Sequence, residues 1–238
     1  MDLYWIDPSL AIASRPRGGD WLDDEMASLR RQGVDILVSC LASPEERELG
    51  LSDEERAASR AGIAFARAPI EDRGTPASTA DFEGVIRRLT ADRRAGRRVA
   101  VHCRQGLGRG PLVAAAVLVR SGFSADEAWN LIRERRNQPV PDTDEQREWV
   151  HAFARNGEER RSLTARGASA AAHSRRSRAA SAGGRGCSRP SPASGRSEAT
   201  ISSASGRPRY RRPSRWPQQA TSSHAAPESR TPGRTRLR

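Results

Sequence analysis

The chain has 238 residues and a formal net charge of +12, and it contains no lysine. The basic excess lies after residue 159, because residues 160–238 hold 18 arginines against only two acids, Glu198 and Glu228. The first 159 residues therefore carry a net charge of −4, which gives no reason to expect a basic nucleic-acid-binding face on this part.

The first half of the chain alternates between apolar strands and amphipathic helices. Strands are expected at residues 10–13, at residues 34–39 and from residue 63, and helices are expected at residues 20–31 and 52–62. Leu22, Met26 and Leu29 fall on one face of the first helix. Ser52 is the expected N-cap of the second helix, with Glu55 three residues on at the capping-box position.

The second half continues the alternation. Residues 72–77 form a loop rich in Gly and Pro, a helix is expected over 78–94, and residues 98–102 form the most apolar strand. Three closing helices are expected at residues 112–120, 126–136 and 143–153. Strands that alternate with helices predict an α/β fold with a central, mostly parallel sheet flanked by helices. We expect one such domain over residues 1–156.

Residues 157–238 are dominated by Arg, Ser, Ala, Gly and Pro. Such a segment cannot bury enough apolar surface to offset its ordering entropy, so a disordered tail is expected. Two interpretations stay open for it: a polybasic arm for nucleic acid or an anionic surface, or a dispensable extension.

The N-terminus is acidic, and no apolar run approaches the ~18 residues of a membrane span, so cytoplasmic location without a membrane contact is expected. Three cysteines, Cys40, Cys103 and Cys187, are too few and too scattered for a disulfide framework or a zinc site. We expect no metal, no organic cofactor and a monomeric chain. A lone cysteine beside a histidine, as at Cys103, is a candidate nucleophile.

The strand that ends at His102 runs directly into a glycine-containing loop and then a helix. The loop residues are Cys103, Arg104, Gln105, Gly106, Leu107, Gly108 and Arg109. Amides of such a loop and of the first helical turn point into one hollow, where the helix dipole adds positive charge. The same field favours the thiolate of Cys103, and Arg109 can grip two phosphate oxygens at once.

Other interpretations of this loop fit less well. A nucleotide-binding P-loop needs a lysine, and the glycine spacing and late position do not match a dinucleotide fingerprint. A tight turn with an ordinary buried cysteine stays as the simplest structural alternative.

The loop from His102 to Arg109 resembles the signature of the protein-tyrosine and dual-specificity phosphatase superfamily. Residues 14–16, 69–76 and 141–146 also resemble segments of its small bacterial members, and the short domain favours the dual-specificity branch. The resemblance implies hydrolysis of phosphate monoesters, with phosphotyrosine, phosphoserine or phosphothreonine in proteins as substrate. It further implies attack by Cys103, a phosphocysteine, and hydrolysis of that intermediate by water.

The resemblance also implies a carboxyl group on a mobile loop that acts first as general acid for the leaving oxygen and then as base for the attacking water. Asp72 is the candidate for this group, and Glu71 is the neighbouring rival. His102 is expected to support the loop and the thiolate through hydrogen bonds. Gln146 resembles a position near the pocket that could orient water, although an exposed early-helix residue is the simpler interpretation.

One residue departs from the family pattern. The residue after the signature arginine is usually Ser or Thr, whose hydroxyl stabilises the departing thiolate, whereas this chain has Gly110. Slow hydrolysis of a long-lived intermediate is therefore expected. The alternatives are a non-catalytic phosphate-binding module, or the same chemistry on RNA 5′-phosphates, phosphoinositides or sugar phosphates.

Overall fold

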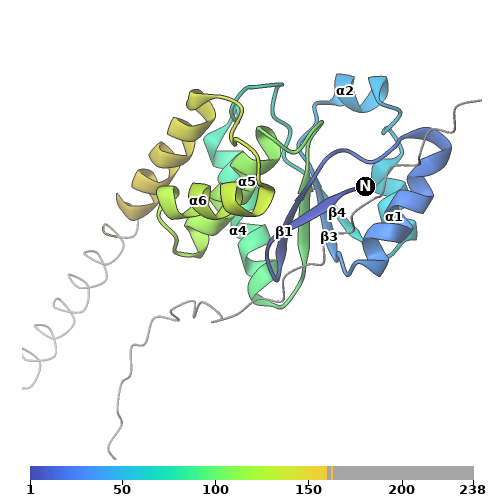
Figure 1. The fold of residues 1–238 in the computed structure, drawn as a ribbon, viewed down its shortest axis with the longest axis horizontal. Helices are drawn as coiled ribbons and strands as arrows, with labels where there is room; N and C mark the ends of the chain where they lie inside the picture. The colour runs from blue at the N-terminus through green and yellow to red at the C-terminus, as the bar shows by residue number, and fades with distance from the viewer. Residues whose placement is uncertain (160–161, 163–238) are drawn as a thin grey trace, which may run out of the picture. The chain divides into compact units, whose positions relative to one another are not determined.

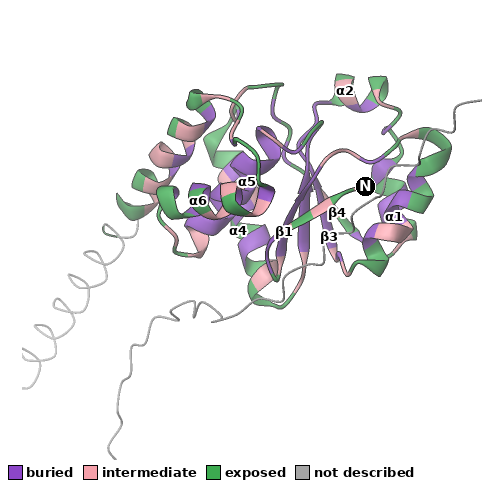
Figure 2. Ribbon diagram, in the orientation of Figure 1, coloured by how far each residue is buried: buried purple, intermediate pink, exposed green. Residues whose placement is uncertain are grey.

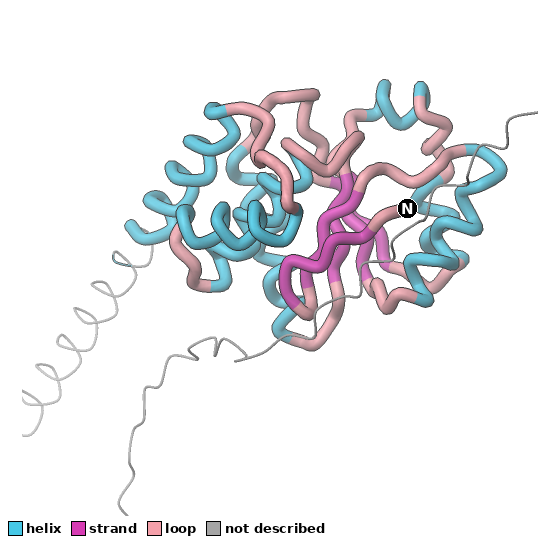
Figure 3. Tube along the Cα trace, viewed as in Figure 1, coloured by secondary structure: helices cyan, strands magenta, loops and turns pink. Residues whose placement is uncertain are grey.

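A five-stranded sheet with the strand order β1-β2-β5-β3-β4 forms the centre of the protein. The computed structural model describes residues 1–159 and 162. The strands are β1 (Leu3–Asp7), β2 (Leu10–Ala13), β3 (Ile36–Ser39), β4 (Ala64–Arg67) and β5 (Val99–His102). β1 pairs antiparallel with β2, and the other three pairings are parallel. Figure 3 shows the strands between the helices.

Helices cover both faces of the sheet (Figure 1). They are the 3-10 turn Gly19–Trp21, α1 (Leu22–Arg31), α2 (Ser43–Glu48), α3 (Glu54–Arg60), α4 (Thr79–Arg94), α5 (Arg109–Ser121), α6 (Ala125–Arg136) and a last helix over residues 144–159. α1 and α3 pack on one face, whereas α4, α5, α6 and the last helix pack on the other.

The sheet is buried on both sides, as a parallel sheet between helices must be. In β3, Ile36 and Val38 face α4, α5 and α6, while Leu37 between them faces α1 and α3. This alternation follows the two-residue period of a strand. Figure 2 shows the central strands and much of α5 as buried.

The fold predicted from the sequence is confirmed: the sheet is mostly parallel, and helices flank it. Two elements were not foreseen, the edge strand β1 and the six-residue helix α2. The cap predicted at Ser52 is wrong, because α3 begins at Glu54 and its N-cap residue, Asp53, makes no side-chain hydrogen bond.

The position of β5 in the sheet determines where its carboxyl end lies. β5 pairs with β2 on one side and β3 on the other, so its carboxyl end lies in the middle of the sheet. In open parallel sheets, ligands bind outside the carboxyl ends of the strands.

Within the described residues, no helix is long and apolar enough to cross a membrane. The predicted tail lies outside the described residues, apart from 157–159 and 162.

Candidate active site

Cys103 lies between the end of β5 and the start of α5, at the base of the predicted loop. Its side chain is buried, and its Sγ accepts a hydrogen bond from the Gly106 N–H at 3.2 Å. Gly106 has φ of +73°, and a Cβ at this position would lie only 2.7 Å from the Ala13 carbonyl oxygen. The loop therefore needs glycine here to turn an amide towards the sulfur.

Arg109 opens α5, and its side chain is 98% buried. Nη1 donates to Glu45 Oε2 at 2.5 Å and to the Ile70 carbonyl oxygen at 3.1 Å, and Nη2 donates to Glu45 Oε1 at 3.0 Å. Burial raises the pKa of Glu45, but its hydrogen bonds from Arg109 and Ala42 outweigh burial and hold that pKa below its usual range. Glu45 is thus an ionised carboxylate that orients the guanidinium through two hydrogen bonds.

A cavity of about 250 Å³ opens over the sulfur and the guanidinium. Its lining comes from the loop and from two other segments: Cys103, Arg104, Gln105, Leu107, Gly108 and Arg109, with Asp72, Arg73 and Asp142. The Cys103 sulfur, the buried Arg109 guanidinium and loop backbone thus surround one hollow, an arrangement that suits a tetrahedral oxyanion.

Asp72 reaches this cavity from the loop between β4 and α4. Its Oδ1 lies 2.9 Å from Arg109 Nη2, and 65% of its side chain is exposed. The neighbouring rival, Glu71, is exposed and does not line the cavity. The position of Asp72 is thus compatible with proton transfer to a group bound above Cys103.

The His102 imidazole does not make the predicted hydrogen bonds to the loop and to the thiolate. Its Nε2 lies 3.0 Å from Glu54 Oε1, and both side chains are completely buried. Among the described residues, no hydrogen bond joins the imidazole to Cys103 or to the loop. The carbonyl oxygen of His102 instead accepts from the Cys40 N–H at 2.9 Å.

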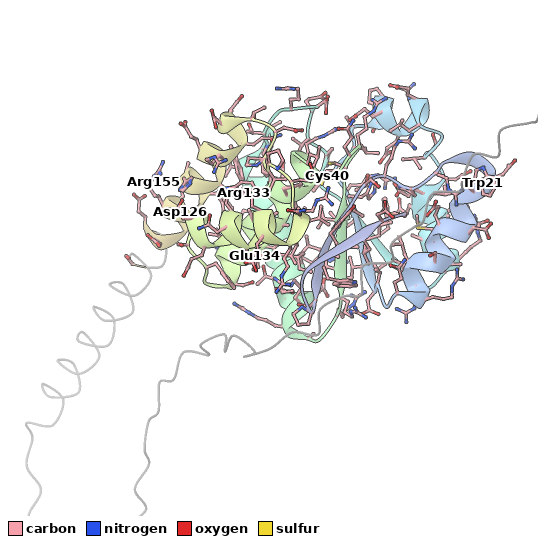
Figure 4. All side chains as sticks on the ribbon, viewed as in Figure 1. Trp21, Cys40, Asp126, Arg133, Glu134 and Arg155 are labelled. Carbon is pink, nitrogen blue, oxygen red and sulfur yellow. The ribbon has the colours of Figure 1, made fainter. Side chains whose placement is uncertain are left out.

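Cys40 is a core residue, as predicted, and its side chain is fully buried. It follows β3 where Cys103 follows β5, and the two strands pair in register at Ser39 and His102. Burial raises the pKa of the Cys40 thiol well above its usual range, and the nearby Cys103 raises it further. Figure 4 shows Cys40 in the interior of the protein. Cys40 therefore stays a neutral thiol beside the candidate nucleophile.

Gln146 is buried, so its interpretation as an exposed early-helix residue is wrong. Its Nε2 donates to the Gly74 carbonyl oxygen at 2.9 Å, while its Oε1 has no donor among the described residues. A Cβ on Gly108 would lie 2.9 Å from Gln146 Oε1 and 2.6 Å from Asp142 Oδ2. Gln146 thus joins the loop of residues 103–109 to the loop that carries Asp72, because Gly74 lies two residues beyond Asp72.

Arg136 at the end of α6 supports the loop from another direction. Its Nε donates to the Gly106 carbonyl oxygen at 3.2 Å, and its guanidinium stacks 3.8 Å from the centroid of the Tyr4 ring. This contact holds the peptide between Gly106 and Leu107, next to the peptide that carries the Gly106 N–H. Arg104, which also lines the cavity, pairs with Glu48 at 2.8 Å.

The comparisons with known proteins agree with this geometry. The family model of the dual specificity phosphatase catalytic domain matches residues 25–155. Human dual specificity protein phosphatase 5 is 32% identical over 74 residues, which cover 31% of this chain and 19% of that protein. The chain thus matches about a fifth of the length of this curated relative.

Solved structures of phosphatases have the same fold. Kinase associated phosphatase, solved with its catalytic cysteine replaced by serine, superposes with a TM-score of 0.59 at 22% identity, over 65% of this chain and 94% of that chain. The active form of Tk-PTP gives a TM-score of 0.55 at 27% identity, over 64% of this chain and 96% of that chain. PTPMT1 gives a TM-score of 0.57 at 20% identity, over 68% of this chain and 99% of that chain.

Proposed function

Because this chain belongs to the dual specificity phosphatase catalytic-domain family, we propose that it hydrolyses phosphate monoesters in proteins through a phosphocysteine at Cys103. One observation carries the proposal: the Cys103 sulfur and the braced Arg109 guanidinium line the same cavity of about 250 Å³. We place the catalytic domain over residues 1–156, a range that includes the whole family match.

The first step is the transfer of the phosphoryl group to sulfur. Loop amides and Arg109 bind the phosphate oxygens, and the Cys103 thiolate attacks phosphorus in line with the leaving oxygen. The S–P bond forms while the P–O bond to the leaving group breaks. Asp72 donates the proton that the leaving oxygen needs, which its place on the cavity wall permits.

The second step is hydrolysis of the phosphocysteine. Water attacks phosphorus and gives a proton to the Asp72 carboxylate that the first step left, the S–P bond breaks, and the electron pair returns to sulfur as the thiolate. The Gly106 N–H, 3.2 Å from Sγ, is placed to stabilise that returning charge. Gly110 contributes no hydroxyl to it, so this second step is expected to limit turnover.

The cavity lining has mixed charge, with Arg73, Arg104 and Arg109 beside two carboxylates, so a polyanion would meet carboxylates as well as arginines. Asp72 and Asp142 both line the cavity, and Arg104 at its edge is already paired with Glu48. A phosphoinositide headgroup or an RNA end with several phosphates would meet these carboxylates. PTPMT1 has also been solved in complex with PI(5)P, and that fold likeness, at 19% identity, keeps a phosphoinositide as the second candidate.

A substrate panel tests this choice. The full chain is assayed for phosphate release from phosphotyrosine, phosphoserine and phosphothreonine peptides, from phosphoinositide vesicles and from a 5′-phosphorylated RNA. We expect the highest kcat/KM on a phosphopeptide. A higher kcat/KM on the vesicles or the RNA would contradict the protein substrate, and binding without release on every substrate would contradict the enzyme.

Restoring a hydroxyl after Arg109 is expected to speed turnover. A Cβ on Gly110 would lie 3.7 Å from Cys103 Sγ and 3.6 Å from Ile12 Cγ2, which is ordinary van der Waals contact. Gly110→Ser therefore fits, and its hydroxyl can donate to the departing thiolate. Because a hydrogen bond to a charged group is worth about 1.5–3 kcal/mol, kcat should rise roughly 10-fold or more while kcat/KM stays unchanged.

The matched control is Gly110→Ala, which adds the same Cβ without the hydroxyl. We expect its steady-state constants to equal those of the wild type. If alanine accelerates turnover as much as serine does, the effect comes from the backbone of α5, and the role assigned to the hydroxyl is wrong.

A further inference from the structure

A buried arginine contacts the loop of residues 103–109 from outside the cavity and has no part in the reaction described so far. Arg136 is the last residue of α6, which packs beside β1 (Figure 1). Its side chain is buried and does not line the cavity. Its Nε donates to the Gly106 carbonyl oxygen at 3.2 Å, and its guanidinium lies 3.8 Å from the centroid of the Tyr4 ring. Arg136 therefore fixes the direction of one loop carbonyl.

The direction of the Gly106 carbonyl determines the direction of the next amide. The peptide between Gly106 and Leu107 is trans. In a planar trans peptide the C=O and the N–H point in opposite directions. Because the Gly106 carbonyl points to Arg136, which does not line the cavity, the Leu107 N–H points away from Arg136. Leu107 itself lines the cavity, so its N–H is placed to face the hollow over Cys103.

The Leu107 N–H is also available to a ligand. Among the described residues, it donates no hydrogen bond. The same arrangement occurs two residues earlier in the loop, where the Arg104 carbonyl oxygen accepts from the Arg15 N–H at 3.3 Å. The next N–H, that of Gln105, likewise has no acceptor within the described part of the chain. Two loop amides thus remain available to the oxygens of a bound phosphate.

We propose that Arg136 is a positioning residue, which aims the Leu107 N–H at the transferring phosphoryl group. The inference rests on the proposed function, because it needs a phosphate bound over Cys103. By holding the Gly106 carbonyl, Arg136 keeps the peptide between Gly106 and Leu107 from rotating. The Leu107 N–H then donates to a phosphoryl oxygen during transfer to sulfur and during hydrolysis. A donor that is oriented in advance needs no reorganisation as the reaction proceeds.

Two substitutions of Arg136 separate its hydrogen bond from its charge. Glutamine carries its amide nitrogen as many bonds from Cα as arginine carries Nε, so Arg136→Gln keeps a donor for the Gly106 carbonyl and loses the cation. Methionine has a methyl group at that place, so Arg136→Met loses both.

The two variants are expected to differ in activity. Arg136→Met should lower kcat/KM for an aryl phosphate by about 30-fold. This is less than the roughly 10²–10³-fold cost of removing an oxyanion donor, because the Leu107 amide is still present but misaimed. Arg136→Gln should stay within about 5-fold of the wild type, since its neutral donor still makes the hydrogen bond.

Phosphate binding supplies a second readout, which does not depend on turnover. Equilibrium dialysis with labelled inorganic phosphate measures the Kd of each variant. A hydrogen bond to a charged group contributes about 10-fold or more, so the Kd of Arg136→Met should be about 10-fold higher than that of the wild type. The Kd of Arg136→Gln should stay close to the wild-type value.

Arg93→Met is the matched control for loss of stability. Arg93 is another buried arginine, and its ion pair with Asp7 ties α4 to the turn between β1 and β2. This turn lies beside Val99, the first residue of β5, and so at the opposite edge of the sheet from the loop. Arg93→Met should lower the midpoint of thermal unfolding at least as far as Arg136→Met does, and should keep the wild-type kcat/KM and Kd.

The outcomes separate this inference from the function on which it rests. Equal losses in Arg136→Gln and Arg136→Met, or wild-type values in both, would overturn it, because the hydrogen bond to the Gly106 carbonyl would then not determine activity. An equal loss of kcat/KM in Arg93→Met would assign the effect to the fold and would also overturn it. If the wild type neither hydrolyses the aryl phosphate nor binds phosphate, the proposed function itself is wrong, and this inference with it.

Discussion

Replacement of Cys103 by serine is expected to lower aryl phosphate hydrolysis by about 10⁴-fold or more, the scale of loss seen when an enzyme's nucleophile is removed. The serine hydroxyl is a far weaker acid than a thiol, so almost none of it ionises at neutral pH. The site itself should persist, because a serine Oγ can accept the hydrogen bond of the Gly106 N–H, and the hydrogen bonds of Arg109 to Glu45 and of Arg136 to the loop do not involve sulfur. The variant should therefore still bind phosphate.

Cys40→Ala is the matched control for this loss. Cys40 is also buried, and it follows the neighbouring strand at the same level as Cys103. Its replacement should reduce the free energy of unfolding modestly and leave kcat/KM near the wild-type value. Thermal unfolding of both variants separates loss of catalytic activity from loss of the fold. A Cys103→Ser chain that is folded and keeps a tenth of the activity would exclude the covalent mechanism.

Arg109→Lys is expected to lower kcat by about 10³-fold although the positive charge is retained. The guanidinium uses two nitrogens to hold both oxygens of Glu45 and still donates to the Ile70 carbonyl oxygen. A single ammonium group cannot satisfy this set and also grip two phosphate oxygens. The loss should fall mainly on kcat, because the planar fork matches the transferring phosphoryl group best in the transition state.

Arg67→Lys provides a comparison for that substitution. Arg67 also pairs with two carboxylates, those of Glu46 and Glu55, but it lies on β4 and does not line the cavity. We expect kcat and KM of this variant to match those of the wild type. If kcat and KM of Arg109→Lys also match those of the wild type, the proposed bidentate binding of phosphate by Arg109 is wrong, and this arginine has only a structural role.

The loop of residues 103–109 could be predicted because its parts are contiguous. An apolar strand ends at His102, glycines follow, and Arg109 begins an apolar helix, so the chain order alone places sulfur and guanidinium together. The buried strands and long helices were equally visible, since each carries its own periodicity. The helix α4, for example, begins after Ser78, which accepts from the Asp81 N–H as a cap.

Parts of the site that come from elsewhere in the chain were not visible. Glu45 lies on α2, a helix of six residues that is too short to show an apolar face, and it meets Arg109 across 64 positions. Asp142 is an exposed acid in a short connecting segment, which resembles any solvated turn. Their positions at the site follow from packing between distant segments, and no local pattern encodes that packing.

The burial of Gln146 also could not be predicted from the sequence. A polar residue in the first turn of a helix is normally exposed, which is why the simpler interpretation was wrong. Its burial depends on two long-range contacts, a hydrogen bond to the Gly74 carbonyl oxygen and close approach to Gly108. The pattern 141–146 could indicate that this segment belongs to the site, but not which of its atoms faces the loop.

The most direct test of the phosphocysteine mechanism is a rapid acid quench of the wild-type chain during hydrolysis of a labelled aryl phosphate, followed by peptide mapping. The slow second step expected with Gly110 predicts that phosphate accumulates on the peptide that contains Cys103 and decays as inorganic phosphate is released. Hydrolysis that proceeds with no phosphate on Cys103, or with phosphate on another side chain, would contradict the mechanism.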